Sequence, residues 1–245
     1  MSNEILESLK NRKSVRVYSS KNITAEDKAA IIDAALQAPT AGNMLLYSII
    51  DVTDPEVKTS LSVLCDNQPF IAKAPLVLVF CADWQKWFDS FKLLYGDDVR
   101  TPRLGDYSLA VSDSLIAAQN TVVAAESLGI GSCYIGDVIE NCEDVRSLLQ
   151  LPDYVVPAAL LCYGYPTEQQ KNRSKPPRCK AEFVVSENSY RRLDPEQLTA
   201  MFNSKTGTAD GFDKEVRGLF ERKWSQKFMA EMTRSIEKWM EPFKS

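Results

Sequence analysis

Two arginines and a serine near the N-terminus alternate in a way that suits an anion. They belong to the run Arg12-Lys13-Ser14-Val15-Arg16, which follows a short helical stretch. In an extended segment every second side chain shares a face, so Arg12, Ser14 and Arg16 would point together while Lys13 points away. Two guanidinium groups and a hydroxyl can hold a phosphate or a carboxylate. The alternative is a solvated, charged face.

A second basic cluster comes later in the chain. The segment Gly164-Tyr-Pro-Thr167 is followed by a loop that two consecutive prolines stiffen. Such a loop can supply the other half of a phosphate clamp, although a solvated loop is again the alternative. Its cations are Lys171, Arg173, Lys175 and Arg178.

Two segments rich in small residues would let a ligand approach the backbone. The first, APTAGN over 38–43, joins a helix to a strand and is otherwise an ordinary connection. The second, LGIGSCYIG over 128–136, is not a dinucleotide-binding fingerprint. The residue three after Gly131 is Tyr134, and the segment follows a helix where the fingerprint must follow a strand. Its glycines predict a tight turn against which a flat ring can lie.

The composition excludes several classes of function. The chain has no histidine, which rules out imidazole bases, Ser-His-Asp or Cys-His pairs and histidine metal ligands. The 29 basic residues against 33 acidic ones argue against nucleic acid as a partner. Six cysteines without a C-x-x-C pair predict reduced thiols in the core and no metal site. The N-terminus lacks a signal-peptide core and no stretch approaches the ~18 apolar residues of a membrane span, so we expect a cytoplasmic protein.

The elements that must position these residues alternate irregularly, which favours a single α+β layer arrangement over a strict βαβ repeat. Apolar periodicity, caps and prolines mark the helices, and Gly129 suits a left-handed C-terminal cap. Short β-branched and aromatic runs mark the buried strands. Helices are expected over 24–39, 55–64, 107–128 and 141–151, and strands over 45–52, 76–81 and 155–163.

Bulky residues recur every four positions over 213–243, from Phe220 and Trp224 to Met240. This spacing predicts a helix, and because it drifts by ~40° per step the stripe wraps around it. The face either packs on its own domain or forms an arm that embraces a second subunit. The polar residues 203–212 before it predict a mobile loop.

Taken in order, the motifs resemble the FMN-dependent nitroreductase family, and most closely its NADPH-preferring branch of nitroreductases and flavin reductases. The likeness covers nearly the whole chain. It is carried by RKSVRVY, APTAGN, Asp66-Asn-Gln-Pro-Phe70 before a strand, AAESLGIGSCYIG, and CYGYPT with a downstream KPPR. It implies a central mixed, mainly antiparallel sheet flanked by helices. It also implies one FMN-binding domain over 1–245, whose C-terminal helical arm, about 195–245, wraps the partner of a homodimer.

The resemblance assigns cofactor contacts residue by residue. The N-terminal contacts would meet the FMN phosphate together with two later cations, the APTAGN residues would line the ribityl chain, and Gln68 would hydrogen-bond the pyrimidine edge. A cation such as Arg16 would stabilise negative charge on the reduced flavin. Two departures from the family pattern are Asn43-Met-Leu-Leu46, where Asn-x-Gln-Pro is usual, and the second proline before Arg178. The implied contacts are Arg12, Lys13, Ser14, Arg16, Thr40, Asn43, Gln68, Tyr134, Ile135, Gly136, Lys175 and Arg178.

The implied activity is ping-pong electron transfer. NADPH or NADH would reduce FMN, and a nitroaromatic, a quinone or free flavin would take the electrons, with no catalytic side chain needed. Two alternatives stay open: a reductive dehalogenase-like or flavin-destructase-like member of the same scaffold, and a flavin-binding redox sensor or storage protein without turnover. For nucleotide preference, Lys205, Arg217 and Arg222 either meet a 2′-phosphate or are simply solvated.

Overall fold

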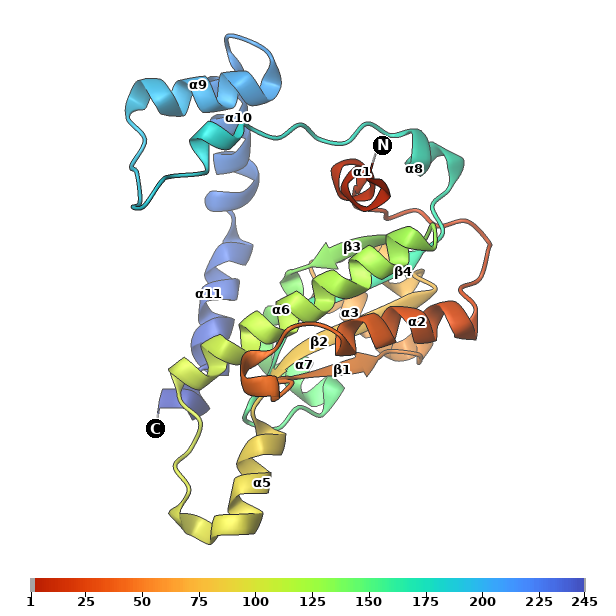
Figure 1. Ribbon diagram of the computed structural model, residues 1–245, viewed down its shortest axis with the longest axis vertical. Coiled ribbons are helices and arrows are strands. Elements are labelled where there is room, and N and C mark those ends of the chain that lie inside the picture. The colour runs from red at the N-terminus through yellow and green to blue at the C-terminus, as the bar shows by residue number, and fades with distance from the viewer. Residues whose placement is uncertain (1–2, 245) are drawn as a thin grey trace. The chain divides into compact units, whose positions relative to one another are not determined.

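The computed structural model describes residues 3–244. Contacts between Cα atoms divide the chain into two compact units, the first formed by residues up to 173 with those from 231 onward, the second by residues 174–230. The first unit holds the sheet and most of the helices (Figure 1). Within the described residues no helix is both long and apolar enough to cross a membrane.

The first unit is built around one antiparallel sheet with the strand order β1-β2-β4-β3. The two central strands are buried along almost their whole length, as their unbroken apolar sequences predict. All three strands expected from the sequence are present, so the prediction of an α+β fold is confirmed. The strands are β1 (Tyr47–Asp51), β2 (Leu76–Asp83), β3 (Gly131–Ile135) and β4 (Val155–Gly164).

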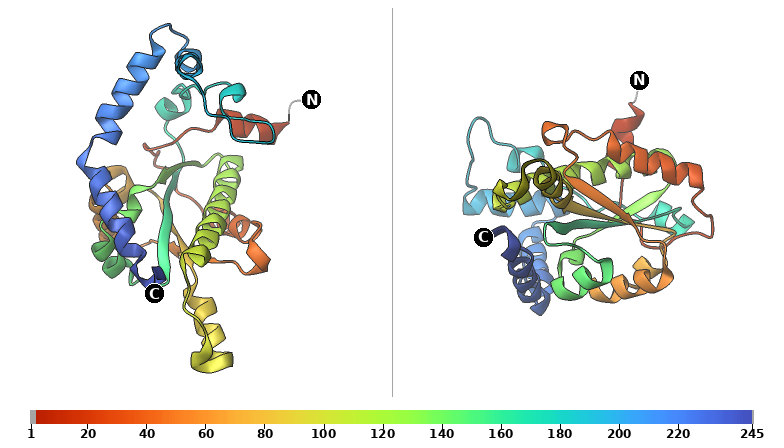
Figure 2. Two further views of the ribbon diagram at one scale, coloured as in Figure 1. Left: turned by 90° about the vertical axis from the view of Figure 1, so that its left-hand side faces the viewer. Right: turned by 90° about the horizontal axis from the view of Figure 1, so that it is seen from below.

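Helices cover both faces of this sheet (Figure 2). Leu78 and Phe80 of β2 point into one apolar cluster with residues of α2 (Ala25–Leu36) and α6 (Leu104–Ser127). Val79 of the same strand points the other way, into a cluster built with α3 (Pro55–Leu64) and α7 (Cys142–Leu149). The alternation follows from the two-residue period of a strand.

Helices form in all four stretches expected between residues 24 and 151, although α6 begins earlier, at Leu104, and the Asn141 side chain does not cap α7. Thr24 Oγ1 accepts a hydrogen bond from the Asp27 amide at 3.0 Å, and Pro55 begins α3. Gly129, with φ of +71°, ends α6 in the left-handed region. Five of the six cysteines are buried free thiols, as expected of small core residues. The remaining helices of the first unit are α1 (Glu4–Asn11), α4 (Pro69–Ala72), α5 (Gln85–Tyr95) and α8 (Glu168–Asn172).

The prediction of a tight turn over 128–136 was wrong for most of that segment. Only its beginning turns, and residues from Gly131 onward form β3, paired with β4 in the register Cys133↔Cys162. Glycine and serine weaken the strand signal in the local sequence. The strand forms because it pairs with β4, a long-range contact that the local sequence does not indicate. The segment that was predicted to lie against a flat ring therefore includes an edge strand of the sheet.

The C-terminal predictions were partly wrong. Residues 203–206 belong to α9 (Pro195–Thr206), which an Asp194–Gln197 capping box starts and Gly207 ends, so the loop is shorter than expected. The helix expected over 213–243 is divided into α10 (Gly211–Leu219), a wide turn over Phe220–Trp224 and α11 (Lys227–Trp239). At its end, Trp239 is fully buried in the core of the first unit.

Candidate functional site

The N-terminal basic run lies beside the end of the sheet because two glycines leave room for it. Residues after Asn11 run extended, and the Val15 amide donates to the Ser132 carbonyl at 3.0 Å. Gly131 and Gly164 face each other across β3 and β4. A Cβ on Gly131 would lie 2.3 Å from the Val15 side chain, and one on Gly164 would lie 2.4 Å from the Tyr18 ring. Any larger residue would push the basic run away from the sheet.

Three of the predicted anion-binding residues gather at one end of β3. Arg12 donates to Ser132 Oγ at 3.5 Å, and its guanidinium lies 6.0 Å from the centre of the Tyr134 ring. Burial raises the pKa of the Cys133 thiol, and the charges of Arg16 and Arg12, with a hydrogen bond to Ser14, act against that shift. Arg12, Ser14 and Arg16 therefore all act on the same thiol, which agrees with the shared face that a two-residue period predicts.

Lys13 points the other way, as the extended pattern predicts. Its ammonium donates to the carbonyl oxygens of Lys171 and Arg173, at 2.5 and 2.6 Å. Arg173 in turn donates to the Ser14 carbonyl at 2.8 Å. Lys13 thus fastens the basic run to the end of α8.

A buried carboxylate that the sequence analysis missed organises the loop with Thr40 and Asn43. Asp113 of α6 accepts hydrogen bonds from Thr40 Oγ1, from the Ala41 amide at 3.1 Å and from the Leu46 amide at 3.3 Å. Asn43 stays exposed, with a left-handed φ of 58°. The available signal was that Asp113, one of two acids in the apolar 107–128 segment, lies on the same helix face as residues that pack against the sheet.

Gln68 meets a second residue that sequence reasoning missed. Its amide Nε2 donates to the Cys65 carbonyl at 2.8 Å and to Asp137 Oδ2 at 2.6 Å. Asp137 directly follows Gly136, so this contact joins the Gln68 turn to the end of the ring-facing segment. No local pattern marks Asp137, because its partner lies 69 positions away.

The three predicted ring-facing residues present different groups. Tyr134 is half-buried, and its hydroxyl donates to Gln119 Oε1 at 3.4 Å. Ile135 points to the opposite face of β3 and is buried in the core with Cys133. A Cβ on Gly136 would meet no atom within 4 Å, so the surface there is open. Ile135 can therefore meet a ligand only through its backbone.

Lys175 and Arg178 belong to the second unit, over 174–230. Arg178 donates to the Pro176 carbonyl at 3.3 Å and is exposed. That these two cations complete a phosphate clamp with Arg12 stays a prediction.

The clustered residues of the first unit fit FMN. The Arg12 Nε is buried and has no hydrogen-bond partner among the residues described, which leaves a cationic donor for an anionic oxygen. Arg16 adds a second cation, placed 5.7 Å from the centre of the Phe70 ring. Open backbone at Gly136 and the Gln68 amide lie on adjoining segments, as a flat ring with a polar edge requires.

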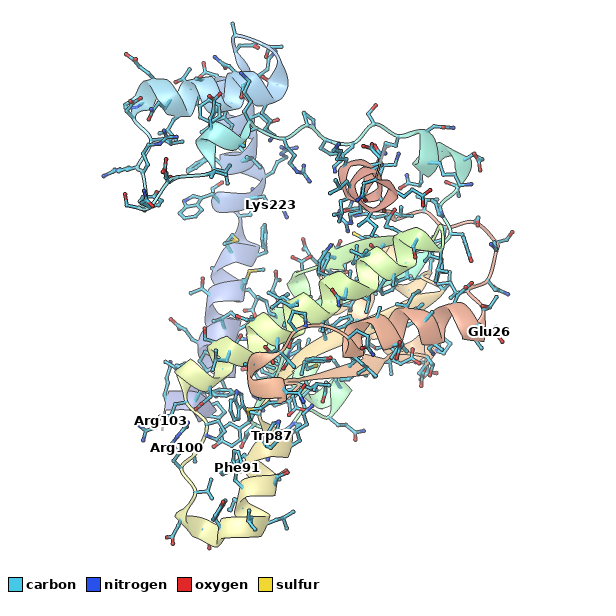
Figure 3. All side chains as sticks on the ribbon, in the orientation of Figure 1. Glu26, Trp87, Phe91, Arg100, Arg103 and Lys223 are labelled. Carbon is cyan, nitrogen blue, oxygen red and sulfur yellow. The ribbon has the colours of Figure 1, made fainter. Side chains whose placement is uncertain are left out.

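Another aromatic cluster, on α5, is a poor alternative site. Trp87 and Phe91 pack with ring centres 5.6 Å apart, beside Arg100 (Figure 3). The neighbouring cavity holds only about 90 Å³. Asp106 already pairs with Arg100 at 2.6 Å, so the cavity offers neither the room nor a free cation for a flavin nucleotide.

The fold and the basic cluster around Arg12 define a flavin-binding oxidoreductase of the α+β class. Residues 9–165 match the sequence model of the nitroreductase family, and the chain belongs to that family. It is 32% identical to the FMN reductase (NADPH) of Bacillus subtilis, over 93% of this chain and 90% of that protein. It is 35% identical to the oxygen-insensitive NADPH nitroreductase of Salmonella typhimurium, over 82% and 80% of the two chains.

Solved structures agree with this assignment. The NADPH:FMN oxidoreductase of Vibrio harveyi complexed with NAD+ superposes with a TM-score of 0.81 at 29% identity, covering 97% of this chain and 98% of that one. Nitroreductase A of Vibrio parahaemolyticus gives a TM-score of 0.82 at 27% identity, covering 98% of each chain. The resemblance inferred from the motifs is therefore confirmed.

Proposed function

We propose that this chain is an FMN-dependent NAD(P)H oxidoreductase, a nitroreductase and flavin reductase. NADPH or NADH gives up a hydride and leaves before the acceptor, a nitroaromatic, a quinone or free flavin, takes the electrons. The names of the relatives support this activity. The observation that carries it in this chain is the buried, unpartnered Arg12 Nε at the end of β3.

The residues of this chain would bind and orient FMN, which would supply the hydride acceptance and the onward electron transfer. Arg12, Ser14 and Arg16 would hold the anionic part, and Lys175 and Arg178 are further proposed contacts. Lys13 contributes indirectly, because its ammonium fastens the basic run to the end of α8. The remaining proposed contacts, along the ribityl chain, the pyrimidine edge and the ring, are Thr40, Asn43, Gln68, Tyr134, Ile135 and Gly136.

The working assembly in this proposal is a cytoplasmic homodimer. Each chain is one FMN-binding domain over 1–245 that binds small-molecule acceptors, and the arm of about 195–245 wraps its partner. The bulky residues Phe220 and Trp224 support this arrangement, since 55% and 74% of their surfaces are exposed.

Reconstitution of the purified chain with FMN tests the activity directly. Bound FMN should lose its visible absorbance on addition of NADPH or NADH, and steady NADPH oxidation should follow when menadione or nitrofurazone is present. A single stoichiometric reduction without turnover would instead identify a redox sensor or storage protein. Failure to bind FMN, or no bleaching with either nucleotide, would overturn the proposal.

A further inference from the structure

We propose that Asp137 is a positioning residue that makes Gln68 a hydrogen-bond acceptor toward the flavin. This inference rests on the proposed function. By holding the amide nitrogen of Gln68, the Asp137 carboxylate presents the Gln68 carbonyl oxygen, Oε1, to the pyrimidine edge of the ring. The matching group on that edge is the imide N3–H.

The orientation of the Gln68 amide follows from its two neighbours. Nε2 lies 2.8 Å from the Cys65 carbonyl oxygen and 2.6 Å from Asp137 Oδ2. Both neighbours are acceptors, and only an NH2 group can satisfy them, so the reversed amide would set oxygen against oxygen twice. In the part of the chain that the structure describes, nothing donates a hydrogen bond to Oε1, which leaves that oxygen available to a ligand.

The Gln68 side of this contact is held rigidly. Asp66 and Asn67 both have left-handed backbone angles, with φ of 61° and 53°, an arrangement that the surroundings must stabilise. The backbone N–H of Gln68 closes the turn by donating to the Ser62 carbonyl at 2.7 Å.

The Asp137 side is equally constrained. Asn141 donates through its side chain to the Leu64 carbonyl at 2.9 Å, tying the segment after Asp137 to the end of α3. The carbonyl of Ile139 accepts from Ser235 Oγ at 2.6 Å and from the Trp239 indole at 2.9 Å. The backbone on both sides of this contact is therefore held by further hydrogen bonds, which favours an amide that is oriented before any ligand arrives.

The chemistry of the flavin edge makes this orientation matter. The pyrimidine edge carries two carbonyl oxygens, which accept, and one imide N–H, which donates. A Gln68 that offered its NH2 group would pair with a carbonyl oxygen, whereas one that offers Oε1 pairs only with the N–H. Asp137 thereby selects the partner atom without touching the ring.

The test compares FMN with 3-methyl-FMN, in which a methyl group replaces the imide hydrogen. Flavin-fluorescence titrations of the full-length chain should give a preference for FMN of about tenfold or more in the wild type, as expected for one lost buried hydrogen bond. Asp137→Ala frees the amide to rotate and should remove most of this preference. Asp137→Asn, whose carbonyl oxygen can still accept from Nε2, should restore it.

A double-mutant cycle separates positioning from general damage. If Asp137 acts through Gln68, Asp137→Ala should add nothing to the loss of preference in Gln68→Ala. Asp144→Ala, which removes an exposed acid from α7, is the matched control and should keep the wild-type preference.

Equal binding of the two flavins by the wild type, or a preference that survives Asp137→Ala, overturns the inference while leaving the proposed function standing. Absence of FMN binding by the wild type overturns both. If Asp137→Ala does not fold, the wild-type comparison and Asp137→Asn decide the matter.

Discussion

Arg12 has surroundings unlike those of an ordinary surface arginine. One guanidinium nitrogen reaches Ser132, the plane lies near Tyr134, and Nε is buried without a partner among the described residues. Leaving a buried donor of a charged group without a hydrogen-bond partner costs free energy. The unpartnered Nε therefore favours a ligand that accepts this hydrogen bond.

Replacing Arg12 by alanine should weaken FMN binding about 10- to 100-fold, because a hydrogen bond to a charged group contributes about 1.5–3 kcal/mol. Flavin-fluorescence titration of the apoprotein measures the effect. Lys10→Ala is the matched control, since Lys10 is an exposed cation two positions away that pairs with Glu7. Equal losses in both variants would show a general charge effect and contradict the specific contact.

Glu143 gives a residue-level prediction about acid stability. Arg234 donates to both its carboxylate oxygens, at 2.9 and 2.8 Å, and this hydrogen bonding lowers the pKa of Glu143 from 4.5 to about 2. Since the folded-state pKa lies below the ordinary one, the contribution is present above pH 4.5 and is lost as the pH falls to about 2.

The difference in melting temperature between wild type and Glu143→Gln should therefore be constant above pH 5 and disappear near pH 2. Because the pair is exposed, 1 M NaCl should reduce the difference at neutral pH. A difference that grew toward low pH would contradict the assignment.

At the level of elements, the extended N-terminal segment depends on the facing glycines of β3 and β4. The residue types of the basic run can be read from the sequence, but its position cannot, because Gly131 and Gly164, which fix that position, lie far away in the sequence. These glycines let the Val15 and Tyr18 side chains lie close against the strand backbone, and they do not serve as turn residues.

Gly131→Ala should destabilise the fold by about 1–3 kcal/mol through overpacking against Val15, and should also weaken FMN binding by displacing the basic run. Urea denaturation and flavin titration measure the two effects. Val15→Ala combined with Gly131→Ala should recover part of both. Gly105→Ala, where a Cβ meets no atom within 4 Å on α6, should be neutral or slightly stabilising.

The elements also show what sequence can predict here. Thr24, Pro55 and Gly129 mark their helix boundaries through local chemistry, and the apolar runs predict strands β1, β2 and β4. The prediction of burial is right for β2 and β4, whereas β1 is mostly half-buried. Edge strand β3 was missed because it depends on pairing with β4, and the break between α10 and α11 was missed as well. The same limit hid Asp113 and Asp137, whose partners lie 73 and 69 positions away.

For the whole molecule, the two proposed halves of the phosphate site lie in different compact units. Arg12 and Arg16 belong to the first unit, and Lys175 and Arg178 to the second. The family resemblance implies that all four cations contact the same phosphate, and this stays a prediction. The second unit also exposes the bulky residues of the wide turn after α10.

Those exposed residues give a prediction about assembly. Wild-type protein should sediment at twice the mass of one chain, because Phe220 and Trp224 are large apolar groups of the kind that carry binding energy at interfaces. The double variant Phe220→Ala with Trp224→Ala should raise the dimer dissociation constant at least about tenfold. Tyr190→Ala, which removes a ring that is 90% exposed elsewhere in the second unit, should leave the mass unchanged.

If the flavin lies at the subunit interface, FMN affinity measured at low protein concentration should fall in the double variant and recover as the concentration rises. A wild-type monomer that binds FMN fully would contradict the proposed dimer while leaving the cofactor site intact.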